Sequence, residues 1–373
     1  MKDVETEITM VIMVRRVENQ EPILVTKEQV LDALRKVKDP ELLRDVVTLG
    51  MIEDLKTDGG TVSFTLNLTT PACPLREELE ADVKAALHAL PGVEEVKMKT
   101  SAHISATRIT DQADVMRGVK NIIAVASGKG GVGKTTVAVN LAVSLALSGA
   151  RVGLLDADIY GPTVPVMMGV RDRPGAVGNM MVPPTAHGVK VISLGFFYKD
   201  DTPLVWRGPM VAGAVKQLLT QVEWGDLDYL IVDLPPGTGD SSLTLAQTVP
   251  LGGVVIVTTP QEAALNIATK SLAMFRKLNV PILGIVENMS YFVCQHCGEK
   301  THIFSEGGGK RAAKALDAQF LGEIPIYPLI REQSDLGVPV TVSAPKSPES
   351  AAFKDIAFRV AGMVSIVAYE SSK

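Results

Sequence analysis

The run at residues 127–136, SGKGGVGKTT, constrains the fold of this chain more than any other stretch of its sequence. The apolar residues 122–126 precede it, and an alanine- and valine-rich helical pattern over residues 137–148 follows it. A strand, a glycine-rich loop and a helix in this order form the setting in which the pattern G-x-x-x-x-G-K-S/T binds nucleotide phosphates. Residues 128–135 match that pattern, so the sequence predicts a phosphate-binding loop, with a purely structural glycine turn as the alternative.

The residue types of this loop suit a polyphosphate and a divalent cation. Glycines allow successive backbone N–H groups to turn inward, and the positive end of the following helix adds to the attraction for phosphate. Lys134 is expected to pair with the β- and γ-phosphates of ATP, and the hydroxyl of Thr135 to bind Mg²⁺. The other residues expected to contact the nucleotide are Gly128, Lys129, Gly130, Gly131, Val132, Gly133 and Thr136.

The composition of the 373-residue chain argues against several classes of protein. Its net charge of −5 argues against a nucleic-acid partner, because no basic excess is available to contact phosphates. Three cysteines are too few for a disulfide scaffold and indicate a reducing compartment. No apolar run reaches 18 residues, so no membrane span is predicted, and acids come before the first apolar run, which is unlike a secretory signal. We therefore expect a cytoplasmic protein without a membrane partner.

We expect four segments along the chain. They are an extension at residues 1–23, a small α+β domain at residues 24–106, a polar linker at residues 107–120 that lets the domains move, and an ATPase domain at residues 121–373. In the small domain, Thr26 caps a first helix and Gly59-Gly60 makes a hairpin turn. Its other expected elements are a strand and turn at residues 46–55, a strand at 61–68, a helix at 75–90 and a strand at 93–105.

The ATPase segment alternates apolar runs with helical patterns. The expected strands lie at residues 122–126, 151–156, 189–194, 229–233, 254–258, 282–288 and 320–324. This alternation predicts an α/β fold with a doubly wound, mainly parallel sheet. Because ligands of such sheets gather at the carboxyl ends of the strands, the residues that follow each strand are the candidate site residues.

Several strand ends carry groups suited to ATP chemistry. Asp156 and Asp158 follow the second strand, where one carboxylate can order the water shell of a metal while the other orients the attacking water. Asp233 is expected to reach Mg²⁺ through water, and Gly237 to offer its N–H to the γ-phosphate and so sense hydrolysis. Asn288 ends the sixth strand, where a carboxamide can read the adenine edge. A role in turn formation is the alternative for these residues.

Cys294 and Cys297 form a C-x-x-C motif that places two thiolates on one side of a tight turn. Two ligands do not complete a tetrahedral site. Either His296 and His302 complete a zinc site within one chain, or a second chain supplies two further cysteines for a cluster on a two-fold axis. A redox dithiol is a third interpretation, which Gly298 disfavours because thioredoxin-type motifs open a helix.

Taken together, the motifs at residues 118–370 resemble the Mrp/ApbC-type iron–sulfur cluster carriers, which are deviant P-loop ATPases of the MinD/ParA-like kind. The resemblance implies slow, Mg²⁺-dependent hydrolysis of ATP by a homodimer. Its catalytic residues would be Lys129, which reaches the partner's nucleotide, Lys134, and Asp158, which activates water, with Asp156 nearer the metal. The resemblance also makes Asn288 the base reader, beneath a closing loop around residue 325.

The same resemblance implies a labile 4Fe–4S cluster bridged by Cys294 and Cys297 of two chains, received from an assembly scaffold and passed to apo-proteins. Residues 24–106 resemble the SufT-like metal–sulfur cluster assembly domain through Asp39-Pro40-Glu41 and residues 69–74. Within that motif Cys73 is a candidate reactive thiolate or a small buried side chain. The competing functions are a MinD/ParA-like positioning ATPase, a zinc-binding P-loop ATPase and an electron-transferring reductase. The C-terminal helix has few bases and is expected to face the core, which disfavours the positioning role.

Overall fold

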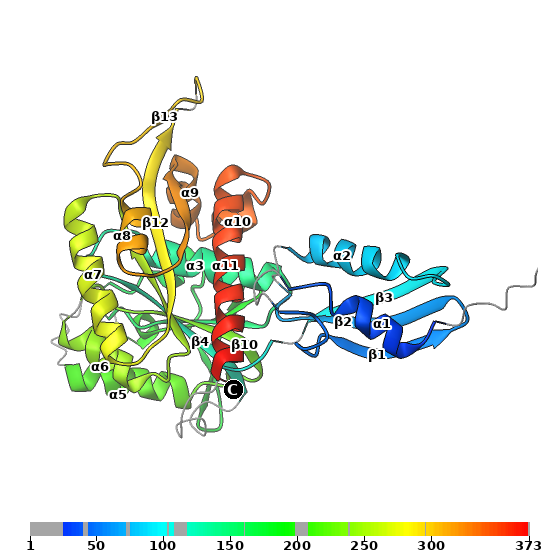
Figure 1. Cartoon of the computed structure of the whole chain (residues 1–373). Helices are drawn as coiled ribbons and strands as arrows, with labels where there is room; N and C mark the ends of the chain where they lie inside the picture. Colours follow the sequence, from blue (N-terminus) through cyan, green and yellow to red (C-terminus); the bar gives the residue numbers. More distant parts are fainter. Residues whose placement is uncertain are drawn as a thin grey trace, which may run out of the picture.

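A computed structural model describes most of the chain. The described residues are 25–39, 44–71, 75–102, 104–107, 118–159, 161–197, 208–237, 239–294 and 296–371. The extension at residues 1–23, the candidate thiolate Cys73 and residues 108–117 of the expected linker lie outside them. Figure 1 shows two regions: a large one built on a sheet with helices on both faces, and a smaller N-terminal one at its side.

The N-terminal region is a three-stranded sheet with helices against it. β1 (Ile52–Asp58) and β2 (Thr61–Leu68) pair antiparallel, and β3 (Glu95–Ala102) runs parallel to β2. β2 alternates half-buried and buried positions, so one of its faces forms the core that α1 (Lys27–Leu34) and α2 (Arg76–His88) cover. The capping box at Thr26 and the hairpin before β2 are confirmed. The strand expected from residue 46 begins only at Ile52, because the residues before it form turns.

The large region is organised around nine described strands in the order β13-β12-β11-β4-β10-β5-β9-β8, with β14 pairing to β12. The parallel strands are β4 (Val119–Ser127), β5 (Val152–Asp156), β9 (Val189–Ser193), β10 (Leu227–Asp233), β11 (Gly253–Thr258), β12 (Ile282–Val293) and β14 (Phe320–Ile326). The edge strands β8 (Thr185–Ala186) and β13 (Lys300–Thr301) run antiparallel. The predicted mainly parallel sheet and all seven of its predicted strands are therefore confirmed.

The two faces of this sheet bury different helices. Along β4, Ile123 and Val125 join one core and Ile122 and Ala124 the other, as side chains of a strand alternate between faces. The first core is covered by α3 (Lys134–Leu147), α4 (Val164–Met167), α9 (Pro328–Asp335), α10 (Val340–Ser343) and α11 (Pro348–Ser371). The second is covered by α5 (Gly208–Thr220), α6 (Asp240–Thr248), α7 (Glu262–Lys277) and α8 (Gly308–Ala315). The C-terminal helix α11 faces the core, as predicted.

The short pairings in the large region were not expected from the sequence. They are β6 (Gly175–Val177) with β7 (Met180–Val182), and the two antiparallel edge strands.

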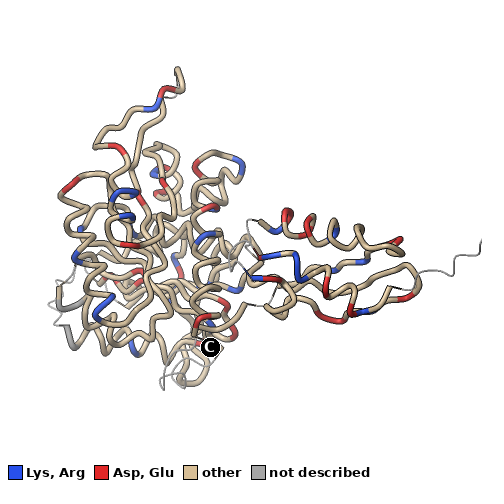
Figure 2. The backbone as a smooth tube through the Cα atoms, viewed as in Figure 1, with Lys and Arg blue, Asp and Glu red and all other residues tan. Residues whose placement is uncertain are grey.

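Figure 2 shows charges of both signs distributed over both regions. Among the described residues no helix combines the length and the hydrophobicity that crossing a membrane requires.

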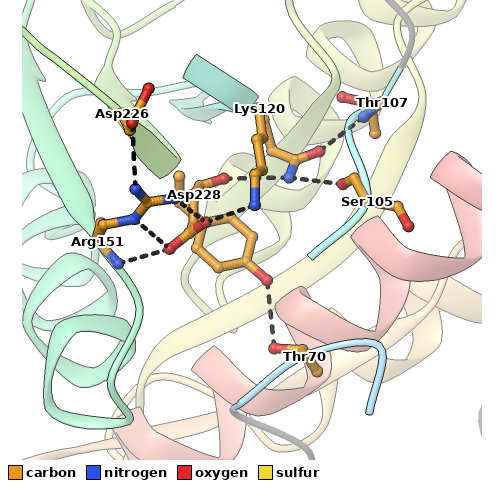
Figure 3. A network of polar contacts seen from close by, with 9 residues as sticks. Thr70, Ser105, Thr107, Lys120, Arg151, Asp226 and Asp228 are labelled. Atoms are coloured by element: carbon orange, nitrogen blue, oxygen red, sulfur yellow. Dashed lines mark hydrogen bonds and ion pairs between the residues drawn. The ribbon is translucent and has the colours of Figure 1, made fainter. Parts of the chain in front are cut away.

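The two regions meet at the start of β4 and β10. The hydroxyl of Thr70, at the end of the N-terminal sheet, lies 3.3 Å from the hydroxyl of Tyr229 in β10 (Figure 3). In β4, Asn121 is fully buried and its carboxamide binds the chain that leaves the N-terminal region, accepting from the amide of Thr107 and donating to the carbonyl of Ser105. At the far end of α11, the guanidinium of Arg44 lies 5.4 Å from the ring centroid of Tyr369. The strands β4 and β10, which begin at this contact between the two regions, thus end at the predicted nucleotide site.

Candidate functional site

The phosphate loop lies between β4 and α3, at the carboxyl edge of the sheet. β4 has β10 on one side and β11 on the other, so the chain order reverses here, as at ligand sites of doubly wound sheets. Gly133 has φ +80°, and a Cβ at this position would lie 2.2 Å from Nδ2 of Asn288. Only glycine therefore fits at the point where the loop enters α3.

Lys134 is held between two carboxylates. Its Nζ lies 2.6 Å from Oδ1 of Asp233 and 3.6 Å from Oδ2 of Asp158. The Thr135 hydroxyl donates to the other oxygen of Asp233, at 2.7 Å. Burial raises the pKa of Asp233, and the charge of Lys134 opposes that effect. The structure therefore brings Lys134, Thr135, Asp158 and Asp233, four of the predicted site residues, into one cluster.

Asp156 is buried next to this cluster and is held in place by hydrogen bonds. Its carboxylate accepts hydrogen bonds from the amides of Asp158 and Val164 and from the hydroxyl of Ser193, at 3.1, 3.3 and 2.9 Å. Burial and then the charge of Asp233 raise the pKa of Asp156 to about 8. Both oxygens of Asp156 accept hydrogen bonds from donors of its own chain.

The residues present fit Mg²⁺. Three buried carboxylates, those of Asp156, Asp158 and Asp233, lie together with the ammonium group of Lys134, which contacts the last two. Oδ1 of Asp158 is buried and has no hydrogen-bond partner among the described residues. Excess negative charge and an unpartnered carboxylate oxygen are both satisfied by a hydrated divalent cation, and Mg²⁺ binds through oxygen ligands. Thr135, Asp156 and Asp233, which the sequence predicts for Mg²⁺, all belong to this group of residues.

Two further loop contacts bear on the predicted roles. The amide of Gly237, which has φ +92°, donates to the carbonyl of Ser127 at 2.8 Å. The N–H group expected at the γ-phosphate thus donates to the last residue of β4, directly before the phosphate loop. Lys129 is exposed, and only its carbonyl is engaged in a described hydrogen bond, from the Ser127 hydroxyl at 3.1 Å.

A cavity of about 460 Å³ opens beside the loop. Gly133, Thr136, Asn288, Pro325 and Tyr327 are among its lining residues. Asn288 is buried, and its Nδ2 donates to the carbonyl of Val132 in the phosphate loop at 2.8 Å. The predicted base reader and the predicted closing loop therefore line one cavity next to the predicted phosphate site.

The cysteine pair lies at the tip of a hairpin that projects from the sheet (Figure 1). β12 continues past Asn288 to Val293, and Cys294 and Cys297 occupy the turn before β13. Cys294 is half-buried and Cys297 exposed. Hydrogen bonds from the backbone amides of Cys297 and His296, and then the Cys297 side chain, lower the pKa of Cys294 and favour its thiolate.

The described contacts of His302 do not place it in a zinc site with the two cysteines. In the described part of the chain, no group of three His, Cys, Asp or Glu side chains is placed to hold a metal ion. The ring of His302 packs at 6.1 Å against that of Tyr291, and its Nε2 lies 3.9 Å from the carboxylate of Glu306.

Two buried residues of this area were missed in the sequence. Ser193 ends β9 and fixes Asp156, and Glu287 accepts hydrogen bonds from the Ser290 hydroxyl and the Gly309 amide. Gly308 begins α8, and a Cβ there would lie 2.6 Å from the carbonyl oxygen of Pro260. A charged residue inside an apolar strand, as Glu287 is, was the available signal.

The fold and the loop cluster define a P-loop NTPase of the MinD/ParA kind. A solved nucleotide-binding protein from Archaeoglobus fulgidus, in complex with ADP, is 39% identical, with a TM-score of 0.57 over 66% of this chain and 98% of that one. The cell-division ATPase MinD of Pyrococcus furiosus, 24% identical with a TM-score of 0.50 over 64% of this chain and 98% of that one, shares the fold.

The chain belongs to the NUBPL iron-transfer P-loop NTPase family, which matches residues 118–361. The family of iron–sulfur cluster assembly proteins matches residues 27–98. An iron–sulfur cluster carrier protein of Synechocystis is 50% identical over 92% of this chain and 99% of the relative. Another, from Escherichia coli, is 42% identical over 91% of this chain and 92% of the relative.

Proposed function

We propose that this protein is an ATP-binding and ATP-hydrolysing carrier that holds a labile 4Fe–4S cluster and passes it to apo-proteins. The observation that carries the proposal is the pair of accessible thiols, Cys294 and Cys297, presented on a projecting hairpin of a P-loop ATPase. A lowered pKa of Cys294 supports it, because the thiolate is the form that binds iron. The names of its near-full-length relatives point to the same function.

ATP hydrolysis is assigned to the cluster around Lys134. A bound phosphate would compete with Asp233 for the ammonium group, so that Lys134 turns from the carboxylate to the β- and γ-phosphates. Asp158, which has one oxygen without a hydrogen-bond partner among the described residues, would orient the attacking water. Mg²⁺, held by Thr135 and Asp233, would neutralise phosphate charge. Hydrolysis is expected to be slow, because the site of one chain is complete only when a second copy of the chain supplies its Lys129.

The carrier is proposed to be a cytoplasmic homodimer. Each chain offers two thiols at one tip, which is half of a four-thiolate site, and a two-fold axis brings two such halves together. The exposure of Lys129 fits the same arrangement, since its side chain is available to a partner. Residues 24–106 are proposed to form the metal–sulfur cluster assembly domain, and residues 107–120 the linker.

Anaerobic reconstitution with iron and sulfide tests the proposal. We expect about four irons per two chains and the absorption of a 4Fe–4S cluster. The variants Cys294→Ser and Cys297→Ser should each lose the iron, whereas His302→Ala should keep it, because the imidazole is not a ligand of the proposed cluster. Stoichiometric zinc that is lost in His302→Ala would instead establish the single-chain zinc site, and iron that survives both cysteine changes would refute the proposal.

A further inference from the structure

The hairpin that carries the thiols has both of its ends in the wall of the cavity beside the phosphate loop. Asn288 and Met289, on the outgoing strand β12, line this cavity. Phe304, on the segment that returns after β13, lines it as well. An occupant of the cavity can therefore contact both ends of the segment at residues 290–303, which includes Cys294 and Cys297.

The outgoing end is a bend with fixed anchors before it. Asn288 is bound to the phosphate loop through the carbonyl of Val132, and Glu287 is held by the Ser290 hydroxyl and the Gly309 amide. Met289 then has φ +56°, in the left-handed region that a residue with a side chain seldom adopts. The pairing of β12 with β14 also shifts register between Asn288 and Phe292. The strand thus bends at Met289, directly beside the cavity, and pairs with β14 again at Phe292.

The returning end is less enclosed. Phe304 is 41% exposed although its ring lines the cavity together with Tyr327 and Ile330. A flat, partly apolar ligand in the cavity would cover this ring and gain the contact area that is now in water. Filling the cavity would in this way fix the returning end against the same wall that holds Asn288.

We infer that Asn288 and Phe304 are positioning residues for the thiols, and that an adenine ring in this cavity sets the position of Cys294 and Cys297 of the same chain. The inference rests on the proposed function and adds that, within one chain, the adenine base links nucleotide binding to the position of the thiols. ADP and ATP both carry the base, so both act on the hairpin, and phosphates alone do not.

The rate of alkylation of Cys294 and Cys297 by N-ethylmaleimide, followed by mass spectrometry on the full chain, tests this path. Saturating MgADP is expected to change the rate at least about fivefold, the lower end of typical coupling between two sites. Magnesium tripolyphosphate, which lacks the base, should leave the rate as it is. A response to tripolyphosphate equal to that to MgADP would overturn the inference, as would a change in rate that only follows dimerisation measured by sedimentation.

Two single-residue variants separate positioning from general structure. Phe304→Ala should bind MgADP, measured by calorimetry, and lose the nucleotide response of the thiols. The matched control is Ile303→Ala, a neighbouring apolar residue that is 54% exposed and does not line the cavity, and it should keep the response. Bound MgADP with unchanged thiol rates in the parent protein contradicts the inference alone. Failure of the parent protein to bind nucleotide contradicts the proposed function instead.

Discussion

Lys134 shows how the loop chemistry depends on single residues. Its ammonium group is the only cation among three buried carboxylates in the described site, and it contacts two of them. The motif in the sequence identified this lysine and Thr135, because the spacing in the loop is local. The support of Asp156 by Ser193 and Val164 was not predictable, because those donors come from segments whose approach only the fold determines.

Lys134→Ala is expected to abolish measurable hydrolysis of ATP and weaken its binding. The loss should be at least about 100-fold in rate, the size seen when one group that stabilises transition-state charge is removed. Phosphate release under saturating MgATP measures it, and circular dichroism checks the fold. Hydrolysis at the parent rate would show that the phosphate loop has been assigned wrongly.

Gly133→Ala should prevent ATP binding. The added methyl group would have to displace Asn288 from the loop, and φ +80° strains any residue with a side chain. The matched control is Gly149→Ala, where φ is +99° but no atom lies within 4 Å of the added Cβ. The control should lose about 1 kcal/mol of stability and still bind ATP, measured by calorimetry. Equal ATP affinity in both variants would contradict the close approach at Gly133.

At the scale of elements, β10 runs from the contact between the two regions to the nucleotide site. Tyr229 and Asp228 lie at its start and Asp233 at its end. The strand itself was predicted from its apolar run, since a fully buried parallel strand has a continuous apolar sequence. The extension of β12 beyond Asn288 was not predicted, because the chain bends at Met289 and most of residues 289–293 are only half-buried.

The pH dependence of stability should reveal the ion pairs at the start of β10. Although burial opposes it, hydrogen bonds from Arg151 and Lys120 hold the pKa of Asp228 at about 2. A depressed pKa means that the ionised form stabilises the folded state, so the contribution is present above about pH 4 and is lost as the pH falls toward 2. Asp228→Asn should therefore cost about 1–2 kcal/mol at pH 7, after allowance for solvent screening, and little near pH 2.

Urea unfolding between pH 7 and pH 2.5 measures this difference. Asp226→Asn serves as the control, because Asp226 lies 3.7 Å from Arg151 with a side chain that is 77% exposed. Its substitution should change stability by less than about 0.5 kcal/mol at every pH, as expected for an exposed pair. A constant difference between Asp228→Asn and the parent across the pH range would contradict the assignment.

At the scale of the whole molecule, the chain presents its two chemistries at separate places. The nucleotide cluster lies at the carboxyl edge of the sheet, and the thiols lie at the tip of a hairpin rooted beside it. The existence of both was predictable from motifs. The contact between Thr70 and Tyr229 and the position of Phe304 at the cavity were not predictable, because each brings together segments far apart in the sequence.

Native mass spectrometry of the anaerobically reconstituted protein tests whether two chains share one cluster through four thiolates. We expect a mass of two chains plus one 4Fe–4S cluster, and no such species when Cys294 and Cys297 are both serine. A single chain that carries the metal by itself, as zinc or as a complete cluster, would contradict it.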